Sequence, residues 1–127
     1  MFSHVILGAN DLAASKTFYD AALAALGHAA GREVPGAGRV MYMSHSGVFG
    51  IGTPIDGEAA CHANGGTLGF AATSEAEVDA FHAAGVANGG VSIEEAPGLR
   101  VSPYGKLYLA YLRDPSGNKI CAMYRPQ

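Results

Sequence analysis

The sequence predicts an α+β fold in which one βαβββ module is used twice. The first observation is an internal repeat: HVILGANDLAASKTFYDAALAALG, beginning at His4, matches TLGFAATSEAEVDAFHAAGVANGG, beginning at Thr67, at an offset of 63 residues. At that offset Phe18 falls on Phe81 and Gly27 falls on Gly90, so a helix anchor and a helix stop coincide. The second observation is that turn-punctuated strand patterns follow each predicted helix.

The first repeat reads as a strand, a capped helix and a glycine stop. Asp11 offers a side-chain oxygen for the unpaired N–H groups at a helix start. Apolar residues then recur at helical spacing, while Ser15, Lys16 and Asp20 are expected to face away from the sheet. Gly27 permits the left-handed residue that ends the helix. The helix is expected to pack on a sheet through Leu12, Tyr19, Leu23 and Leu26.

The second repeat begins its helix with a capping box, in which Ser74 is followed by Glu77. The helix is predicted to run to about Asn88, because Gly89 and Gly90 follow. Its apolar stripe is thinner than that of the first helix and consists of Val78, Phe81, His82 and Val86.

Further strands complete each module. The best candidates are RVMYMSH and GVFGIGTP in the first half and KLYLAYLRD and NKICAMY in the second, whereas HAAGREV and GVSIEEA are weaker. GAG near Gly36 and the segment APGLRVSPYGK are expected to be the two long loops, and the polar PIDGEAACHANGG is expected to be a linker. The prediction is a single domain with module one at about 1–56, a linker at about 57–65 and module two at about 66–127.

Composition narrows the class of protein. A chain of 127 residues with 49% hydrophobic and 15% charged residues can bury a sizeable core, which predicts a compact soluble protein. The net charge of -3 and the lack of a Lys/Arg cluster argue against a nucleic-acid partner. The sequence shows no leader pattern and no apolar run of about 18 residues, so we expect a cytoplasmic protein without a membrane partner. Cys61 and Cys121 are expected to be free thiols.

The opening HVILGANDLAASKTFYDAAL and the closing YLAYLRDPSGNKICAMY resemble the vicinal oxygen chelate superfamily, which contains glyoxalase I, bleomycin-resistance proteins and extradiol dioxygenases. The most specific parts are the D-L-x-x-S-x-x-F-Y segment, Asp11 to Tyr19, and the R-D-P-x-G-N turn, Arg113 to Asn118. The resemblance covers nearly the whole chain. It implies two βαβββ modules whose curved mixed sheets form a crevice, and a homodimer that completes or supports it.

Enzymes of this superfamily bind a divalent metal through four positions, on the first and last strand of each module. These positions fall on His4, on Gly50 or Ile51, on Thr67 and on Cys121. A metal acting as a Lewis acid needs several nitrogen and oxygen donors that converge, and His4 is the only family-type ligand retained. No cofactor is therefore predicted, and a divalent metal belongs to the alternative interpretation.

Cys121 has three interpretations. As a metal ligand it would need His4 and a third donor such as His45 or His62. As a nucleophile it would need a base, for which His4 is the candidate. As a small apolar wall residue of the crevice it needs no partner, and this packing interpretation is favoured.

Strand alternation selects the candidate ligand site. It puts His4, Thr67 and Cys121 on the face away from the helices, and it puts Tyr108 and Tyr111 on opposite faces, so only one of these tyrosines can line the crevice. The sequence does not say which one. The RDPSGN turn is expected to be structural. The predicted binding residues are His4, Tyr42, Phe49, Thr67, Arg100, Tyr108, Tyr111 and Cys121.

Three functions compete. The favoured one is metal-free binding of a small, partly apolar molecule, anionic or carbonyl-bearing, with Arg100 and His4 as polar contacts. The first alternative is a metal-dependent lyase or isomerase resembling glyoxalase I, or a dioxygenase, that uses His4 and Cys121. The second alternative is a dimeric scaffold or regulator without a ligand.

Overall fold

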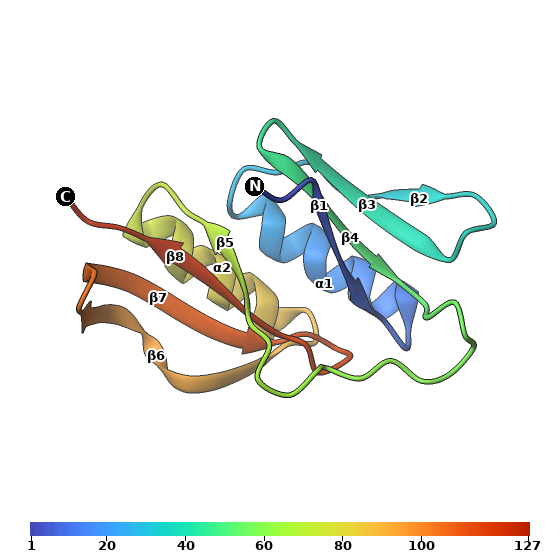
Figure 1. Ribbon diagram of the computed structural model, residues 1–127. Coiled ribbons are helices and arrows are strands. Elements are labelled where there is room, and N and C mark those ends of the chain that lie inside the picture. Colours follow the sequence, from blue (N-terminus) through green and yellow to red (C-terminus); the bar gives the residue numbers. More distant parts are fainter.

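The computed structural model describes residues 1–127 as two modules of the same construction (Figure 1). The first contains β1 (His4–Gly8), α1 (Leu12–Ala24), β2 (Arg32–Val34), β3 (Arg39–Ser44) and β4 (Gly47–Gly52). The second contains β5 (Leu68–Ala71), α2 (Glu75–Ala87), β6 (Val91–Ser102), β7 (Gly105–Arg113) and β8 (Lys119–Tyr124). The predicted α+β fold with two βαβββ modules is confirmed. Neither helix is long and apolar enough to cross a membrane.

Each module forms its own four-stranded mixed sheet. The strand orders are β1-β4-β3-β2 and β5-β8-β7-β6, so the first strand of each module lies at a sheet edge. β1 runs parallel to β4 and β5 runs parallel to β8, while the other pairs are antiparallel. The two sheets are separate in their backbone hydrogen bonding, and therefore contacts between side chains must hold the modules together.

The two helices pack against each other behind the sheets (Figure 1). Asp11 caps α1 by accepting a hydrogen bond from the Ala14 N–H, and Ser74 caps α2 by accepting one from the Glu77 N–H, as predicted. Ser15, however, does not face away from the sheet as predicted. Its side chain is fully buried beside the apolar stripe, because α2 covers a second face of α1 that the sequence pattern leaves polar.

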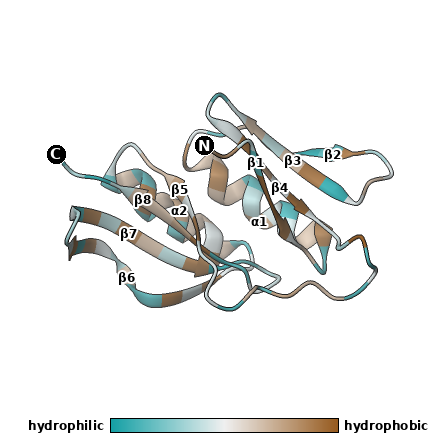
Figure 2. Ribbon diagram, in the orientation of Figure 1, coloured by the Kyte–Doolittle hydropathy of each residue, from teal (hydrophilic) through white to brown (hydrophobic).

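One continuous core spans both modules. Hydrophobic residues of the strands face the helices, and Figure 2 shows β1 as almost continuously hydrophobic. The largest fully buried side chains come from both helices and both sheets, and they include Phe18, Tyr19, Phe81, Ile51, Leu112 and Ile120. Because neither module buries this set alone, the two halves form a single hydrophobic core.

The strand β6 corrects part of the loop prediction. Residues 91–102 form one strand whose pairing with β7 is interrupted between Ile93 and Gly98 by a bulge. Arg100 therefore lies in a strand and not in a loop. Its guanidinium donates hydrogen bonds to the carbonyls of Glu95 and Ala96 within the bulge, and these bonds satisfy backbone groups that lack a partner on β7.

A buried hydrogen bond joins the modules. The Tyr19 hydroxyl on α1 donates to Asp114 Oδ2 in the turn between β7 and β8, at 2.6 Å. The Asn118 side-chain amide donates to Asp114 Oδ2 and also to the Gly8 carbonyl of the first module. Burial, with the Asp114 carboxylate beside it, raises the pKa of Tyr19 well above its ordinary value, so the hydroxyl stays a donor. The RDPSGN turn thus docks the second module on the first.

Tyr19→Phe is expected to lower the free energy of unfolding by about 2 kcal/mol, because a buried carboxylate loses a donor while the ring is kept. Chemical denaturation would measure the loss. The matched control is Tyr108→Phe, which removes an exposed hydroxyl that also donates to a carboxylate, that of Asp79. Tyr108→Phe should lower the free energy of unfolding by less than Tyr19→Phe does. Equal losses in the two variants would contradict a special role for the buried bond.

Candidate functional site

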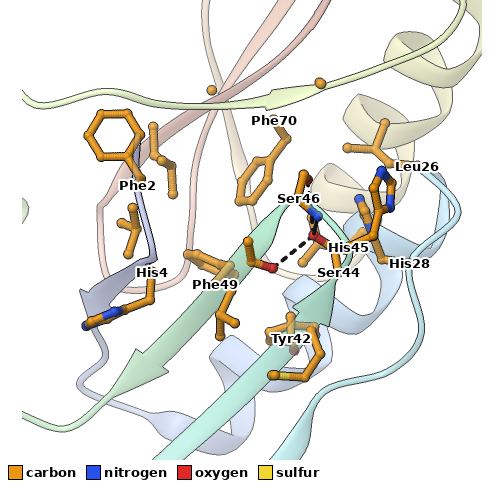
Figure 3. Close-up of a pocket in the computed structure, with 18 of the residues that line it drawn as sticks. Phe2, His4, Leu26, His28, Tyr42, Ser44, His45, Ser46, Phe49 and Phe70 are labelled. Carbon is orange, nitrogen blue, oxygen red and sulfur yellow. Dashed lines mark hydrogen bonds between the residues drawn. The ribbon is translucent and has the colours of Figure 1, made fainter.

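A cavity of about 500 Å³ lies between the two modules, beside the edge strands β1 and β5 (Figure 3). Its lining comes from the residues at the start of the chain through β1, from the end of α1, from the β3–β4 hairpin and from β5. Of the 20 lining residues, 11 are hydrophobic. A cavity of this size and composition lies in the range of small-molecule sites.

Aromatic rings form its walls. Phe49 of β4 meets Phe70 of β5 edge to face, with ring centroids 5.1 Å apart, so this contact crosses from one module to the other. The ring centroid of Tyr42, on β3, lies 5.8 Å from that of Phe49. The ring of Tyr19, which is buried on α1, lies 4.9 Å from Phe49 between centroids. Phe2 precedes β1 and also lines the cavity (Figure 3). The rings support one another, which favours a fixed apolar surface.

The Tyr42 hydroxyl does not point into the cavity, because it binds a polar cluster centred on Asp20. It donates to Asp20 Oδ1 at 2.8 Å, and the Gly31 N–H donates to the same oxygen at 2.9 Å. Lys16 Nζ lies 2.6 Å from Asp20 Oδ2. Partial burial opposes ionisation of Asp20, but the bonds from Lys16, Gly31 and Tyr42 outweigh it and lower the pKa of the carboxyl group. Tyr42 therefore offers the cavity its ring.

The polar part of the lining is concentrated at two turns and a strand end. The β3–β4 turn contributes Ser44, His45 and Ser46, His28 follows α1, and Thr73 follows β5, while Ser3 and His4 lie at the start of β1. The Ser44 hydroxyl donates to the Gly47 carbonyl at 2.9 Å and accepts the Ser46 N–H at 3.3 Å, and these bonds fix the turn. No Asp, Glu, Lys or Arg is among the lining residues.

The structure brings three of the predicted binding residues to this cavity: His4, Tyr42 and Phe49. Tyr42 and Phe49 present their rings to it. The imidazole of His4 is turned away from Phe49 and Phe70 (Figure 3), and its Nδ1 lies 2.8 Å from the Ser3 hydroxyl. Thr67 is exposed immediately before β5 and is not part of the lining.

Tyr111, Cys121 and Arg100 lie elsewhere, on the face of the second sheet away from α2. Tyr111 and Cys121 are direct partners across β7 and β8, and Lys119 Nζ lies 4.9 Å from the Tyr111 ring centroid. Burial raises the pKa of the Cys121 thiol to about 11, so the group stays protonated near neutral pH. This favours the packing interpretation over a nucleophile.

Tyr108 occupies the opposite face of the second sheet. Its hydroxyl donates to Asp79 Oδ1 on α2 at 2.9 Å. The alternation of β7 therefore places Tyr111, and not Tyr108, on the face that also carries Cys121.

The side chains at the family's four metal positions do not fit a divalent ion. No group of three or more His, Cys, Asp and Glu side chains comes together to hold a metal. At the position on the last strand of module one, Ile51 is fully buried, and a Cβ on Gly50 would lie only 2.7 Å from Met41 Sδ. An acidic side chain there would have to displace Met41.

Several lining residues were not among the predicted site residues. Leu68 and Phe70 pack against the hydrophobic core, and Leu23 and Leu26 were expected to pack on the sheet. His28 follows the glycine that ends α1, and His45 lies in the β3–β4 turn. Residues at such positions usually lie on the surface. The available signal was the 63-residue repeat, because it places Phe70 on the first strand of module two, at the edge that faces module one.

Comparisons with known proteins agree with this fold. Residues 1–122 match the family model described as Glyoxalase/Bleomycin resistance protein/Dioxygenase superfamily. The crystal structure of a glyoxalase/bleomycin resistance protein from Albidiferax ferrireducens T118 is 60% identical, with a TM-score of 0.95, and the match covers 98% of this chain and 99% of that one. A search of curated proteins finds no match.

Two more distant structures share the fold. A glyoxalase-related enzyme from Fulvimarina pelagi is 23% identical with a TM-score of 0.74, over 99% of this chain and 88% of that one. Lactoylglutathione lyase from Agrobacterium tumefaciens is 23% identical with a TM-score of 0.65, over 97% of this chain and 92% of that one.

Proposed function

Because the chain belongs to the glyoxalase/bleomycin resistance protein/dioxygenase superfamily, we propose that it binds a small organic molecule, without a metal, in the cavity between its modules. The observation that carries the proposal is the lining: aromatic walls from both modules surround about 500 Å³ and meet a few polar groups on one side. Small-molecule sites combine apolar burial with a small number of orienting polar groups in this way.

The metal-free part of the proposal rests on the donors that the chain offers. His4 is the one family-type ligand, Thr67 is a weak donor, and Cys121 is a soft donor that stays protonated. A lyase, isomerase or dioxygenase reaction that depends on a metal at these positions therefore has less support than binding.

We also propose that the protein forms a homodimer. The face of the first sheet away from α1 exposes apolar side chains, among them Val34 and Met43, with exposed fractions of 40% and 66%. Exposed apolar patches on sheets commonly mark association surfaces.

Light scattering is expected to give twice the 13.0 kDa chain mass at micromolar concentrations. Met43→Lys should shift the distribution toward the monomer, whereas Ala37→Lys, in the exposed turn between β2 and β3, should leave it unchanged. A monomer mass for the parent protein across that range would disprove the dimer.

A variant that fills the cavity tests the binding proposal. Thermal-shift screening of small metabolites is expected to find compounds that raise the Tm of the parent protein, because ligand binding to the folded state stabilises it. Ser46→Trp places a large ring at the cavity mouth and should abolish these shifts. Ala37→Trp introduces the same ring in another exposed hairpin turn of the same sheet and should retain them. Shifts that survive Ser46→Trp would locate binding elsewhere.

Metal removal tests the other half of the proposal. Elemental analysis of the purified protein is expected to find no stoichiometric nickel, zinc, iron or manganese, and EDTA should leave the Tm unchanged, because no metal-binding free energy is linked to folding. The opposite finding, about one metal per chain that is lost in His4→Ala, would restore the metal-dependent enzyme as the better interpretation.

A further inference from the structure

The charges around the cavity restrict what can enter it. No carboxylate lines it, so a cationic ligand would lose its hydration without gaining an ionic partner. The acidic residues near the lining in sequence, Asp20, Glu75 and Glu77, are not part of it, and Glu77 already accepts the Thr73 N–H at 2.6 Å. Cations are therefore disfavoured.

The C-terminal end of α1, which borders the cavity, does not make the cavity a cation site. Carbonyl groups at a helix C-terminus carry partial negative charge and repel anions. Here the Leu23 carbonyl accepts the N–H groups of Leu26 and His28, and the Ala24 carbonyl accepts the N–H of Gly27. With these acceptors satisfied, the helix end offers a ligand few free lone pairs.

The remaining polar side chains of the lining are hydroxyl and imidazole groups, each of which can donate a hydrogen bond. Among the histidines, His4 and His82 have side-chain hydrogen-bond partners within the chain, whereas the imidazoles of the lining residues His28 and His45 have none. A neutral imidazole has one N–H donor and a protonated one has two, so each of these side chains can donate in either state. The cavity therefore offers two imidazoles that can donate to a ligand beside a largely apolar interior.

The shape of the interior favours a ring. Phe49 and Phe70 meet at 90°, so the face of one ring and the edge of the other border the same space. Aromatic rings prefer offset-stacked or edge-to-face contacts, and a flat ligand can make both kinds here. Phe2 lines the same cavity and can cover a bound ring.

From these observations, and resting on the proposed function, we infer that the ligand is a planar aromatic compound bearing a carboxylate or carbonyl oxygen, whose oxygen accepts hydrogen bonds from His28 and His45. The rings of Phe49, Phe70 and Phe2 bury the flat part. Ser46 and Thr73 hydroxyls lie in the same lining and can add further donors.

Four naphthalene probes separate the contributions: 2-naphthoate, 2-acetonaphthone, naphthalene and 2-naphthylmethylammonium. Binding to the full-length protein is measured by fluorescence titration. The two acceptor-bearing probes are expected to bind about three- to tenfold more tightly than naphthalene, the usual range for one net hydrogen bond, and the ammonium probe most weakly. The double variant His28→Leu, His45→Leu should reduce both acceptor probes to the level of naphthalene and leave naphthalene itself unchanged.

Two controls keep the outcomes distinct. His28→Gln with His45→Gln keeps side-chain donors and should retain much of the preference, and His62→Leu, in the exposed linker, should change nothing. Equal binding of naphthalene and the acceptor probes, or strongest binding of the ammonium probe, would overturn the inferred ligand class while leaving small-molecule binding intact. If no probe binds and the metabolite screen is also empty, the cavity is not a binding site and both proposals fail.

Discussion

The hydrogen bond between Tyr19 and Asp114 is the constraint on which the arrangement of the two modules depends. It links the two most family-specific segments of the sequence, one at the start of α1 and the other in the last turn of the chain. Asp114 is also held by the backbone N–H groups of Ser116 and Asn118, so the acceptor cannot move without disrupting the turn. Because the sheets share no backbone ladder, this buried connection and the α1–α2 contact determine how far Phe49 stands from Phe70.

The repeat and the strand patterns were sufficient to predict the fold. Helix starts at Asp11 and Ser74 depend on local hydrogen bonds, which sequence spacing specifies well. The predictions that were wrong concerned residues whose environment depends on segments distant in the sequence. Ser15 is buried because a helix from the other module covers it. Arg100 is in a strand because β6 resumes its pairing with β7 after a bulge, in a segment whose Gly and Pro residues predicted a loop. Neither effect is visible in the periodicity of one segment.

The candidate site was predicted only in part, for a related reason. Strand alternation correctly separates Tyr108 from Tyr111, but it cannot say whether a residue facing a helix ends in solid core or at the wall of a cavity. Phe49 and Phe70 both face the helices, and a cavity remains beside them because two modules meet there without shared strand pairing. The two histidines of the lining lie in connecting segments, where sequence patterns carry little positional information.

The separate hydrogen bonding of the two sheets also bears on how this site can diversify. A cavity enclosed within one continuous sheet has a width fixed by strand spacing, whereas here the width follows from side-chain volumes along the α1–α2 seam. Small changes in that seam, far from any ligand, can open or narrow the space between Phe49 and Phe70 while each sheet keeps its register. The width of the cavity can thereby differ between relatives that keep the same strands, through residues that do not line it.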